Sequence, residues 1–236
     1  MCTVTYIPIN KTDFILTSSR DVPFSREAAM LPKEYTEDGV KITYPKDGKA
    51  GGTWIGYSNK NRLICLLNGG FTNHVSNGEY RKSRGIVVKE LLKQRDIYSA
   101  LSEINLHNIE PFTLVIVDWN DSLKLIEFVW NGTKKYLTDL PQKMHIWSSA
   151  TLYDKQMKKM RQEWFAEWQN SFCPKHIEKD ELFDLYKKRI FNFHKNAGIG
   201  NPEVDVLMRR ENVGTVSITQ VAKKNNSAGM EYFIPS

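Results

Sequence analysis

The spacing of apolar and polar residues changes along the chain, and the changes mark where strands and helices are expected. Apolar runs at 2–9 and 14–18 flank a polar turn and predict a strand hairpin. Runs at 53–58 and 63–67 predict a second hairpin. Segment 22–51 is rich in Pro, Gly, Lys and Glu and has no sustained periodicity, so we expect a long functional loop there.

The period becomes helical at residue 83, where apolar residues recur at positions three or four apart. Residues 83–104 are therefore expected to form two consecutive helices. After the helices, the pattern predicts a hairpin at 112–130 and a short strand at 145–148. Two long amphipathic helices are expected around 157–168 and 182–193, and a terminal strand pair at 215–222 and 230–234.

This order of elements predicts the fold class. Runs of strands precede runs of helices, which favours antiparallel sheets covered by helices over alternating βαβ units. We therefore expect a layered α+β sandwich. The length of 236 residues allows a substantial core, and we expect one domain over residues 1–236.

Composition narrows the class of protein further. With 41% hydrophobic and 25% charged residues, the chain should fold. It has neither a secretory signal nor an apolar run long enough for a membrane span, and its three cysteines are scattered, so we expect a cytoplasmic protein without an integral membrane segment.

The net charge is +6, but the densest basic cluster lies beside acidic residues on a helical face, so we expect no nucleic-acid partner.

The motifs of metal and cofactor sites are missing from the sequence. The five histidines show no HxxH or HExxH spacing, so we predict no metal site. Gly51, Gly52 and Gly56 fit no phosphate-binding loop and are expected to permit a tight strand approach. We therefore predict no cofactor, and the expected partner is a small-molecule substrate or an apolar ligand.

Cys2 directly follows the initiator Met, and its small side chain favours removal of that Met. The mature chain would then carry a thiol and a free α-amine on one residue. An α-amine titrates at about 7.7–8.0 and a thiol at about 8.5, so this residue could supply both base and nucleophile. The alternative is that Cys2 begins a buried strand as a small hydrophobic residue.

Three segments together resemble one family. Met1-Cys2-Thr3-Val4, Ser19-Arg20-Asp21 and 51–56 (Gly-Gly-Thr-Trp-Ile-Gly) resemble the NRDE family, which includes the transport and Golgi organisation proteins. The resemblance continues at Asn68, 83–85 and 147–149. Ser19 and Val22 replace the Asn and Glu of the family name, so these two outer positions cannot be essential to the chemistry.

The resemblance implies the four-layer αββα sandwich of N-terminal-nucleophile hydrolases. It implies that Cys2 is the nucleophile, that Arg20 stabilises its thiolate and that Asp21 orients the α-amine. Asn68 would donate its amide to a tetrahedral oxyanion. The substrate-binding positions implied by the same likeness are Trp54, Arg84, Ser149 and Arg210.

Two functions are compatible with these residues. The first is a hydrolase that cleaves a non-peptide carbon–nitrogen bond, such as an acyl amide, through a Cys2 thioester. The second is a carrier for an apolar anion such as haem, with Arg20 and Arg84 as carboxylate partners. Two structural alternatives also stay open: Arg20 and Asp21 could form an ion pair that only supports the fold, and Trp54 could pack in the core instead of lining a pocket.

Overall fold

The computed structural model describes residues 3–76, 78–172, 174 and 177–235. These residues form twelve strands and four helices in two compact units. The first unit combines Met1–Ser25 with Lys143–Ser236, and the second is Arg26–Gln142. Each unit has its own antiparallel sheet and its own pair of helices. The α+β class predicted from the order of elements is confirmed, whereas the single domain over 1–236 stays a prediction.

The first unit is built on a five-stranded sheet with the order β10-β1-β2-β11-β12. Its strands are β1 (Thr3–Pro8), β2 (Phe14–Pro23), β10 (His145–Ser148), β11 (Val213–Lys224) and β12 (Ser227–Phe233). Thr3 lies opposite Ser19 of β2 and opposite Ser148 of β10. The first residue of β1 is therefore flanked on both sides by paired strands.

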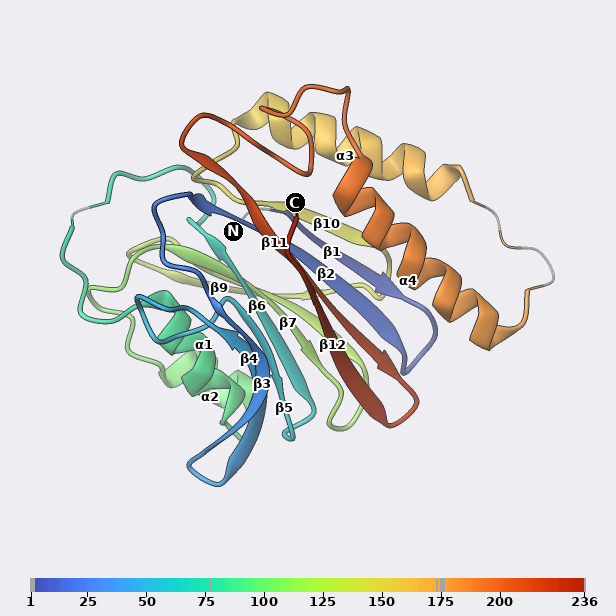
Figure 1. Ribbon diagram of the computed structural model, residues 1–236. Coiled ribbons are helices and arrows are strands. Elements are labelled where there is room, and N and C mark those ends of the chain that lie inside the picture. The colour runs from blue at the N-terminus through green and yellow to red at the C-terminus, as the bar shows by residue number, and fades with distance from the viewer. Residues whose placement is uncertain (1–2, 77, 173, 175–176, 236) are drawn as a thin grey trace. The chain divides into compact units, whose positions relative to one another are not determined.

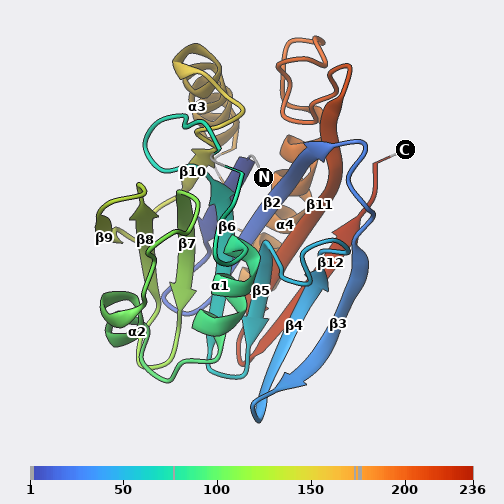
Figure 2. The same cartoon turned by 90° about the vertical axis from the view of Figure 1, so that its left-hand side faces the viewer.

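Two helices cover one face of this sheet, as Figures 1 and 2 show: α3 (Lys155–Asn170) and α4 (Lys179–Asn196). Helix α3 begins after Asp154, whose carboxylate accepts a 2.8 Å hydrogen bond from the Met157 N–H and so caps the helix. The apolar stripes of both helices pack on the sheet. The buried core that results contains Ile7, Ile15, Phe165, Phe183, Ile190, Phe193 and Val206.

The second unit is built on a seven-stranded sheet with sequential order β3 to β9. Its strands are β3 (Met30–Glu37), β4 (Val40–Lys46), β5 (Ile55–Ser58), β6 (Arg62–Asn68), β7 (Phe112–Asp118), β8 (Lys124–Trp130) and β9 (Lys135–Leu140). Its helices are α1 (Arg84–Leu92) and α2 (Ile97–Glu103). Helix α1 packs on β5 and β6.

The strands differ from the predicted ones in three places. Segment 22–51 is not a long loop, because it contains the end of β2 and the hairpin of β3 and β4. Strand β3 is largely exposed at the edge of its sheet, so its polar side chains hide the alternation. Strand β9 is exposed at the other edge and was missed for the same reason. Strand β2 runs past Ser18 to Pro23. The hydrophobic pattern missed this end of the strand, because residues 19–21 are polar although they are buried.

The glycine motif of the second unit meets the start of helix α1. A Cβ atom on Gly52 would lie 2.5 Å from the carbonyl carbon of Gly85, and the Thr53 N–H donates a 3.2 Å hydrogen bond to the Gly85 carbonyl. At Gly56 the strands approach each other closely, as predicted, since a Cβ atom there would lie 3.0 Å from the Cβ atom of Tyr44 on β4. The close approach at Gly52 is made to a helix instead of a strand.

Candidate functional site

The predicted Arg-Asp pair lies on β2 in the first unit. Arg20 and Asp21 are 3% and 1% exposed. Neighbouring residues of a strand point to opposite faces, so the two side chains diverge. Cys2 lies outside the described residues, but the sequence attaches it to Thr3, which is opposite Ser19 in the strand pairing. The start of β1 and the Arg-Asp pair are therefore neighbours in one sheet.

Strand β11 has an irregularity beside this pair. Thr215 lies opposite Asp21, but the next paired residue of β11 is Ser217, opposite Arg20. Val216 is thus an extra residue, and the register shifts at the step between Arg20 and Asp21. Such bulges re-aim side chains and are frequent beside active sites.

The carboxylate of Asp21 is held by two hydroxyl groups. The Tyr153 hydroxyl donates a 2.5 Å hydrogen bond to Oδ2, and the Thr215 hydroxyl donates one of 2.6 Å to Oδ1. The Thr215 hydroxyl in turn accepts a 3.0 Å hydrogen bond from the Met208 N–H. Hydrogen bonds to an ionised acceptor are short and strong, so these donors fix the orientation of the carboxylate.

A buried arginine stacks on the tyrosine of this arrangement. Arg161 of α3 is fully buried, and its guanidinium carbon lies 3.5 Å from the centroid of the Tyr153 ring. Its Nη2 donates to the carbonyls of Val204 and Asp205, at 3.1 and 2.7 Å. Within the described part of the chain, its Nε and Nη1 make no hydrogen bond. The cation–π contact is therefore a principal interaction of this buried charge.

Helix α4 contributes a buried histidine to the same polar interior. His194 is fully buried, with Nδ1 at 2.8 Å from the Ser19 hydroxyl and Nε2 at 2.9 Å from the Thr5 hydroxyl. Burial, helped by the nearby charge of Arg161, lowers the pKa of His194 to about 3. The imidazole is therefore neutral at physiological pH and links α4 to β1 and β2.

Two predicted substrate-binding residues also belong to the first unit. Ser149 follows Ser148, the β10 partner of Thr3, and is 1% exposed. Its hydroxyl lies 3.1 Å from that of Thr151. Arg210 approaches the Tyr153 ring, with 5.9 Å from the guanidinium carbon to the ring centroid, and its Nε donates to the Glu203 carbonyl at 2.9 Å.

The other predicted site residues belong to the second unit. Asn68 is the last residue of β6, and Trp54 is 2% exposed. Arg84 forms an ion pair of 2.9 Å with Glu110, and its Nη1 donates to the Pro111 carbonyl at 3.1 Å. Burial lowers the pKa of Arg84, and the charge of Glu110 opposes this effect. The guanidinium of Arg84 thus already has a carboxylate partner.

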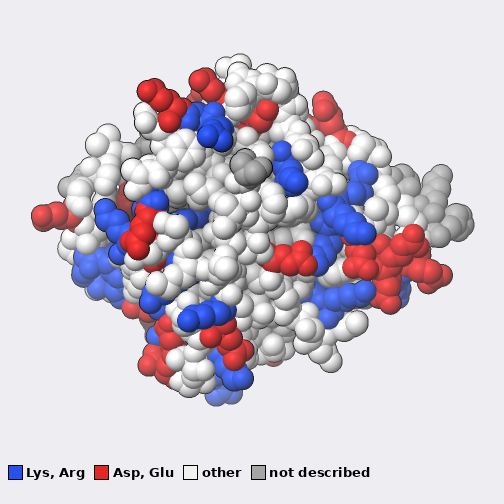
Figure 3. Space-filling view, viewed as in Figure 1, with Lys and Arg blue, Asp and Glu red and all other residues white. Residues whose placement is uncertain are grey.

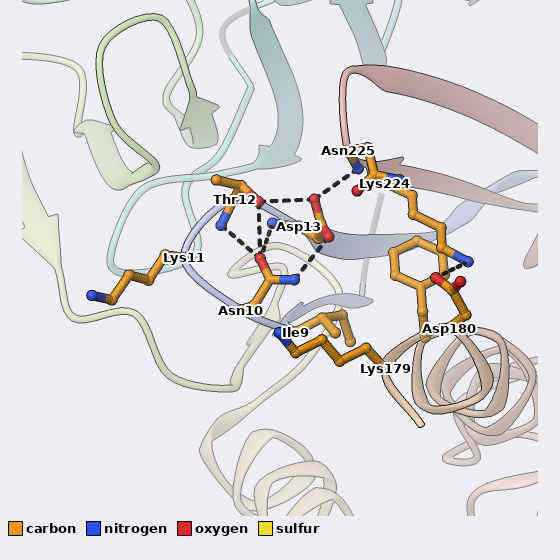
Figure 4. A pocket seen from close by; sticks show the side chains of 10 residues that line it. Ile9, Asn10, Lys11, Thr12, Asp13, Lys179, Asp180, Lys224 and Asn225 are labelled. Atoms are coloured by element: carbon orange, nitrogen blue, oxygen red, sulfur yellow. Dashed lines mark hydrogen bonds and ion pairs between the residues drawn. The ribbon is translucent and has the colours of Figure 1, made fainter. Parts of the chain in front are cut away.

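A pocket of about 370 Å³ opens elsewhere in the first unit, between the β1–β2 turn, the start of α4 and the β11–β12 turn (Figure 4). Its polar groups pair with one another. The Asp13 carboxylate accepts hydrogen bonds from the Asn10 amide at 2.8 Å and from the Asn225 N–H at 2.9 Å, and Lys224 forms a 2.9 Å ion pair with Asp180. These contacts stabilise the turns, and no described site residue predicted above lines this pocket.

Several residues of the site were not predicted from the sequence. Arg161 lies four residues after Met157 and so falls on the apolar stripe of α3, and His194 lies four residues after Ile190 on that of α4. A charged or titratable residue within an apolar stripe is a signal that could have identified both. Tyr153 carries no such signal, because it lies in a loop 132 residues after Asp21.

The surface charge, the helices and the potential metal ligands of the described residues bear on nucleic-acid, membrane and metal binding. On the face shown in Figure 3, basic side chains lie among acidic ones and do not form one continuous basic surface. Among the residues that the structure describes, no helix is both long and apolar enough to cross a membrane. The same residues contain no group of three His, Cys, Asp or Glu side chains that could hold a metal ion.

Solved structures of two hydrolases resemble the chain. A Caenorhabditis elegans orthologue of N-acylethanolamine-hydrolyzing acid amidase matches with a TM-score of 0.58 and 12% identity, over 93% of this chain and 92% of that one. Penicillin V acylase from Agrobacterium tumefaciens matches with a TM-score of 0.55 and 10% identity, over 99% and 86% of the two chains. At such identities the likeness shows the fold alone, which is the N-terminal-nucleophile hydrolase fold that the sequence predicts.

Sequence comparison assigns the family. No curated protein matches the chain. Residues 1–227 match the family described as Transport and Golgi organisation 2, which is the resemblance seen in the N-terminal cysteine, the Arg-Asp pair and the glycine motif. Because this match spans nearly the whole sequence, the chain belongs to the Transport and Golgi organisation 2 family.

Proposed function

We propose that the protein is an N-terminal-nucleophile cysteine hydrolase that cleaves the carbon–nitrogen bond of a non-peptide acyl amide. The fold supports a hydrolase, since the two solved structures described above are an acid amidase and an acylase. The names of both enzymes describe activity on acyl compounds, which is the substrate class we propose here.

The observation that carries the proposal is the orientation of Asp21. Its buried carboxylate is fixed by Tyr153 and Thr215 on a strand that pairs with the first residues of β1. A carboxylate held at the start of the N-terminal strand is suited to orient an α-ammonium group. Because of the bulge at Val216, Thr215 lies opposite Asp21, where its hydroxyl can donate to the carboxylate.

The proposed reaction begins after removal of Met1, which frees the α-amine of Cys2. The amine accepts the thiol proton, and the thiolate attacks the acyl carbon of the substrate. The carbon–nitrogen bond then breaks, the amine product leaves with the proton, and a thioester remains on Cys2. Water attacks the thioester, which releases the carboxylic acid and restores the thiol.

Other residues have supporting roles in this proposal. Arg20 stabilises the thiolate, Asp21 orients the α-amine, and Asn68 donates its amide to the oxyanion of each tetrahedral intermediate. Ser149 and Arg210 are proposed to contact substrate, as is Trp54. Arg84 is likewise proposed to contact substrate, and its ion pair with Glu110 gives it a structural role as well.

The same ion pair bears on the carrier hypothesis. A carboxylate ligand would have to compete with Glu110 for Arg84, which is already paired at 2.9 Å. The carrier function stays a prediction from the sequence, and the hydrolase has the stronger support from Asp21.

The proposal is tested by comparing wild type with Cys2→Ala and Cys2→Ser on a panel of acyl amides and lactams. We expect Cys2→Ala to abolish turnover and Cys2→Ser to retain little, with melting temperatures close to that of wild type. Cys65→Ala is the matched control, because Cys65 is buried on β6 and has no part in the proposed reaction. Equal rates for wild type and Cys2→Ala would remove Cys2 from the mechanism.

A further inference from the structure

The contacts of Asp21 form a chain of groups that leads away from the proposed reaction centre. Arg161 stacks on Tyr153 at 3.5 Å, Tyr153 donates to Asp21, and Thr215 donates to the other oxygen of the same carboxylate. Neither Tyr153 nor Arg161 forms or breaks a bond in the proposed reaction. A fully buried guanidinium is costly unless it is compensated, so its position against this one ring calls for a physical reason.

We propose that Tyr153, held by the stacked guanidinium of Arg161, is a positioning residue that fixes the Asp21 carboxylate for the Cys2 amine. This inference rests on the proposed function. The ring of Tyr153 is kept in place by the cation–π contact, and its hydroxyl therefore meets Oδ2 of Asp21 in one geometry. Thr215 fixes the second oxygen from β11, so the carboxylate cannot rotate.

Charged and titratable groups approach this arrangement from every element around it. Arg20 is the neighbour of Asp21 on β2, Arg161 comes from α3, and His194 comes from α4 and is neutral. Arg210, in the segment before β11, lies 5.9 Å from the Tyr153 ring centroid. Because the pKa of His194 is about 3, its charge does not change between pH 6 and 9.

The proposal predicts the sign of a measurable shift. With one donor removed, the carboxylate of Asp21 is free to turn away from the Cys2 amine. It then stabilises the ammonium form less and repels the thiolate less. Both changes move ionisation of Cys2 to lower pH, which is also the direction expected when the charge of Asp21 itself is removed.

The experiment measures the rate of Cys2 alkylation by iodoacetamide against pH, with the mature protein and peptide-resolved mass spectrometry. We expect Tyr153→Phe to lower the midpoint by about half a pH unit. Thr215→Val is an independent second variant with the same expected direction. Tyr44→Phe is the matched control, because the Tyr44 hydroxyl also donates to a carboxylate, Glu37 at 2.6 Å, but in the second unit. Its midpoint should equal that of wild type.

The outcomes separate this inference from the proposed function. A lowered midpoint in either variant, with an unchanged control, supports positioning even if no amide is turned over. Folded Tyr153→Phe and Thr215→Val whose midpoints equal or exceed that of wild type would overturn it, even if wild type is an active amidase. If neither variant folds while Tyr44→Phe does, the contacts are structural and the proposal is also overturned. Amidase activity is assayed separately on wild type and Cys2→Ala.

Discussion

The hydroxyl of Ser19 lies 2.8 Å from Nδ1 of His194, and this contact joins strand β2, which carries the Arg-Asp pair, to helix α4. On the other side of the ring, Nε2 lies 2.9 Å from the Thr5 hydroxyl of β1. A neutral imidazole has one donor and one acceptor nitrogen, and each hydroxyl can take the complementary role. Ser19 stands where the family motif has Asn. Through its contact with His194, this position links helix α4 to the sheet.

The buried histidine predicts how stability depends on pH. Because the folded pKa of His194 is about 3, below the unfolded value of about 6.5, the unfolded state binds a proton first as pH falls. The contribution of neutral His194 is therefore complete above pH 6.5 and is lost as pH falls toward 3. Between pH 7.5 and 5 we expect a loss of roughly 2 kcal/mol, measured by urea unfolding at each pH.

His194→Gln keeps hydrogen-bonding capacity but cannot titrate, so it should lower stability at pH 7.5 and reduce the loss between pH 7.5 and 5. His107→Gln is the matched control, since His107 is exposed, and it should preserve the wild-type pH dependence. If the His194→Gln variant lost stability on acidification as steeply as wild type, His194 would not be the group responsible.

Replacing Asp21 by Asn tests the carboxylate itself. An amide has one oxygen acceptor, so Tyr153 or Thr215 would lose its partner, and we expect a loss of about 1–3 kcal/mol in unfolding free energy. A loss of stability is thus expected whether Asp21 is catalytic or structural. The pH–rate profile of kcat/KM separates the two roles: loss of the anion should lower the amine pKa and move the profile to lower pH. An unmoved profile would leave Asp21 only a structural role.

The meeting of the glycine motif with helix α1 makes a separate prediction for the second unit. Gly52→Ala would place a methyl group 2.5 Å from backbone of Gly85, which cannot yield as a flexible side chain can. We expect a loss of about 1–3 kcal/mol, measured by chemical denaturation. Gly229→Ala is the control, because a Cβ there meets no atom within 4 Å, and it should change stability little. Equal stability of the two variants would contradict this packing.

The sequence predicted the buried strands better than the exposed ones. Strand β1 and strand β6 have nearly continuous buried residues, and their apolar runs identified them. Strands β3 and β9 lie at sheet edges, where exposed polar side chains remove the alternation on which prediction depends. Edge strands are therefore the part of this fold that hydrophobic pattern alone does not find.

The sequence predicted part of the candidate site, and the missing part has a physical cause. Arg20 and Asp21 were proposed because they belong to a short, recognisable motif, and their catalytic roles stay predictions. Tyr153 was not, because its contact with Asp21 depends on how a loop before α3 folds back on the sheet. Arg161 was not predicted, because it belongs to the densest basic cluster of the sequence and nothing in that cluster indicates that this one side chain is fully buried.

The central claim, that Cys2 forms a thioester with an acyl amide, is tested most directly by intact-mass spectrometry of the native protein before and after incubation with substrate. The account predicts a mature chain that lacks Met1 and gains the mass of one acyl group, removable by hydroxylamine and absent from Cys2→Ala. Quantitative retention of Met1, or an acyl adduct that forms equally on Cys2→Ala, would contradict it.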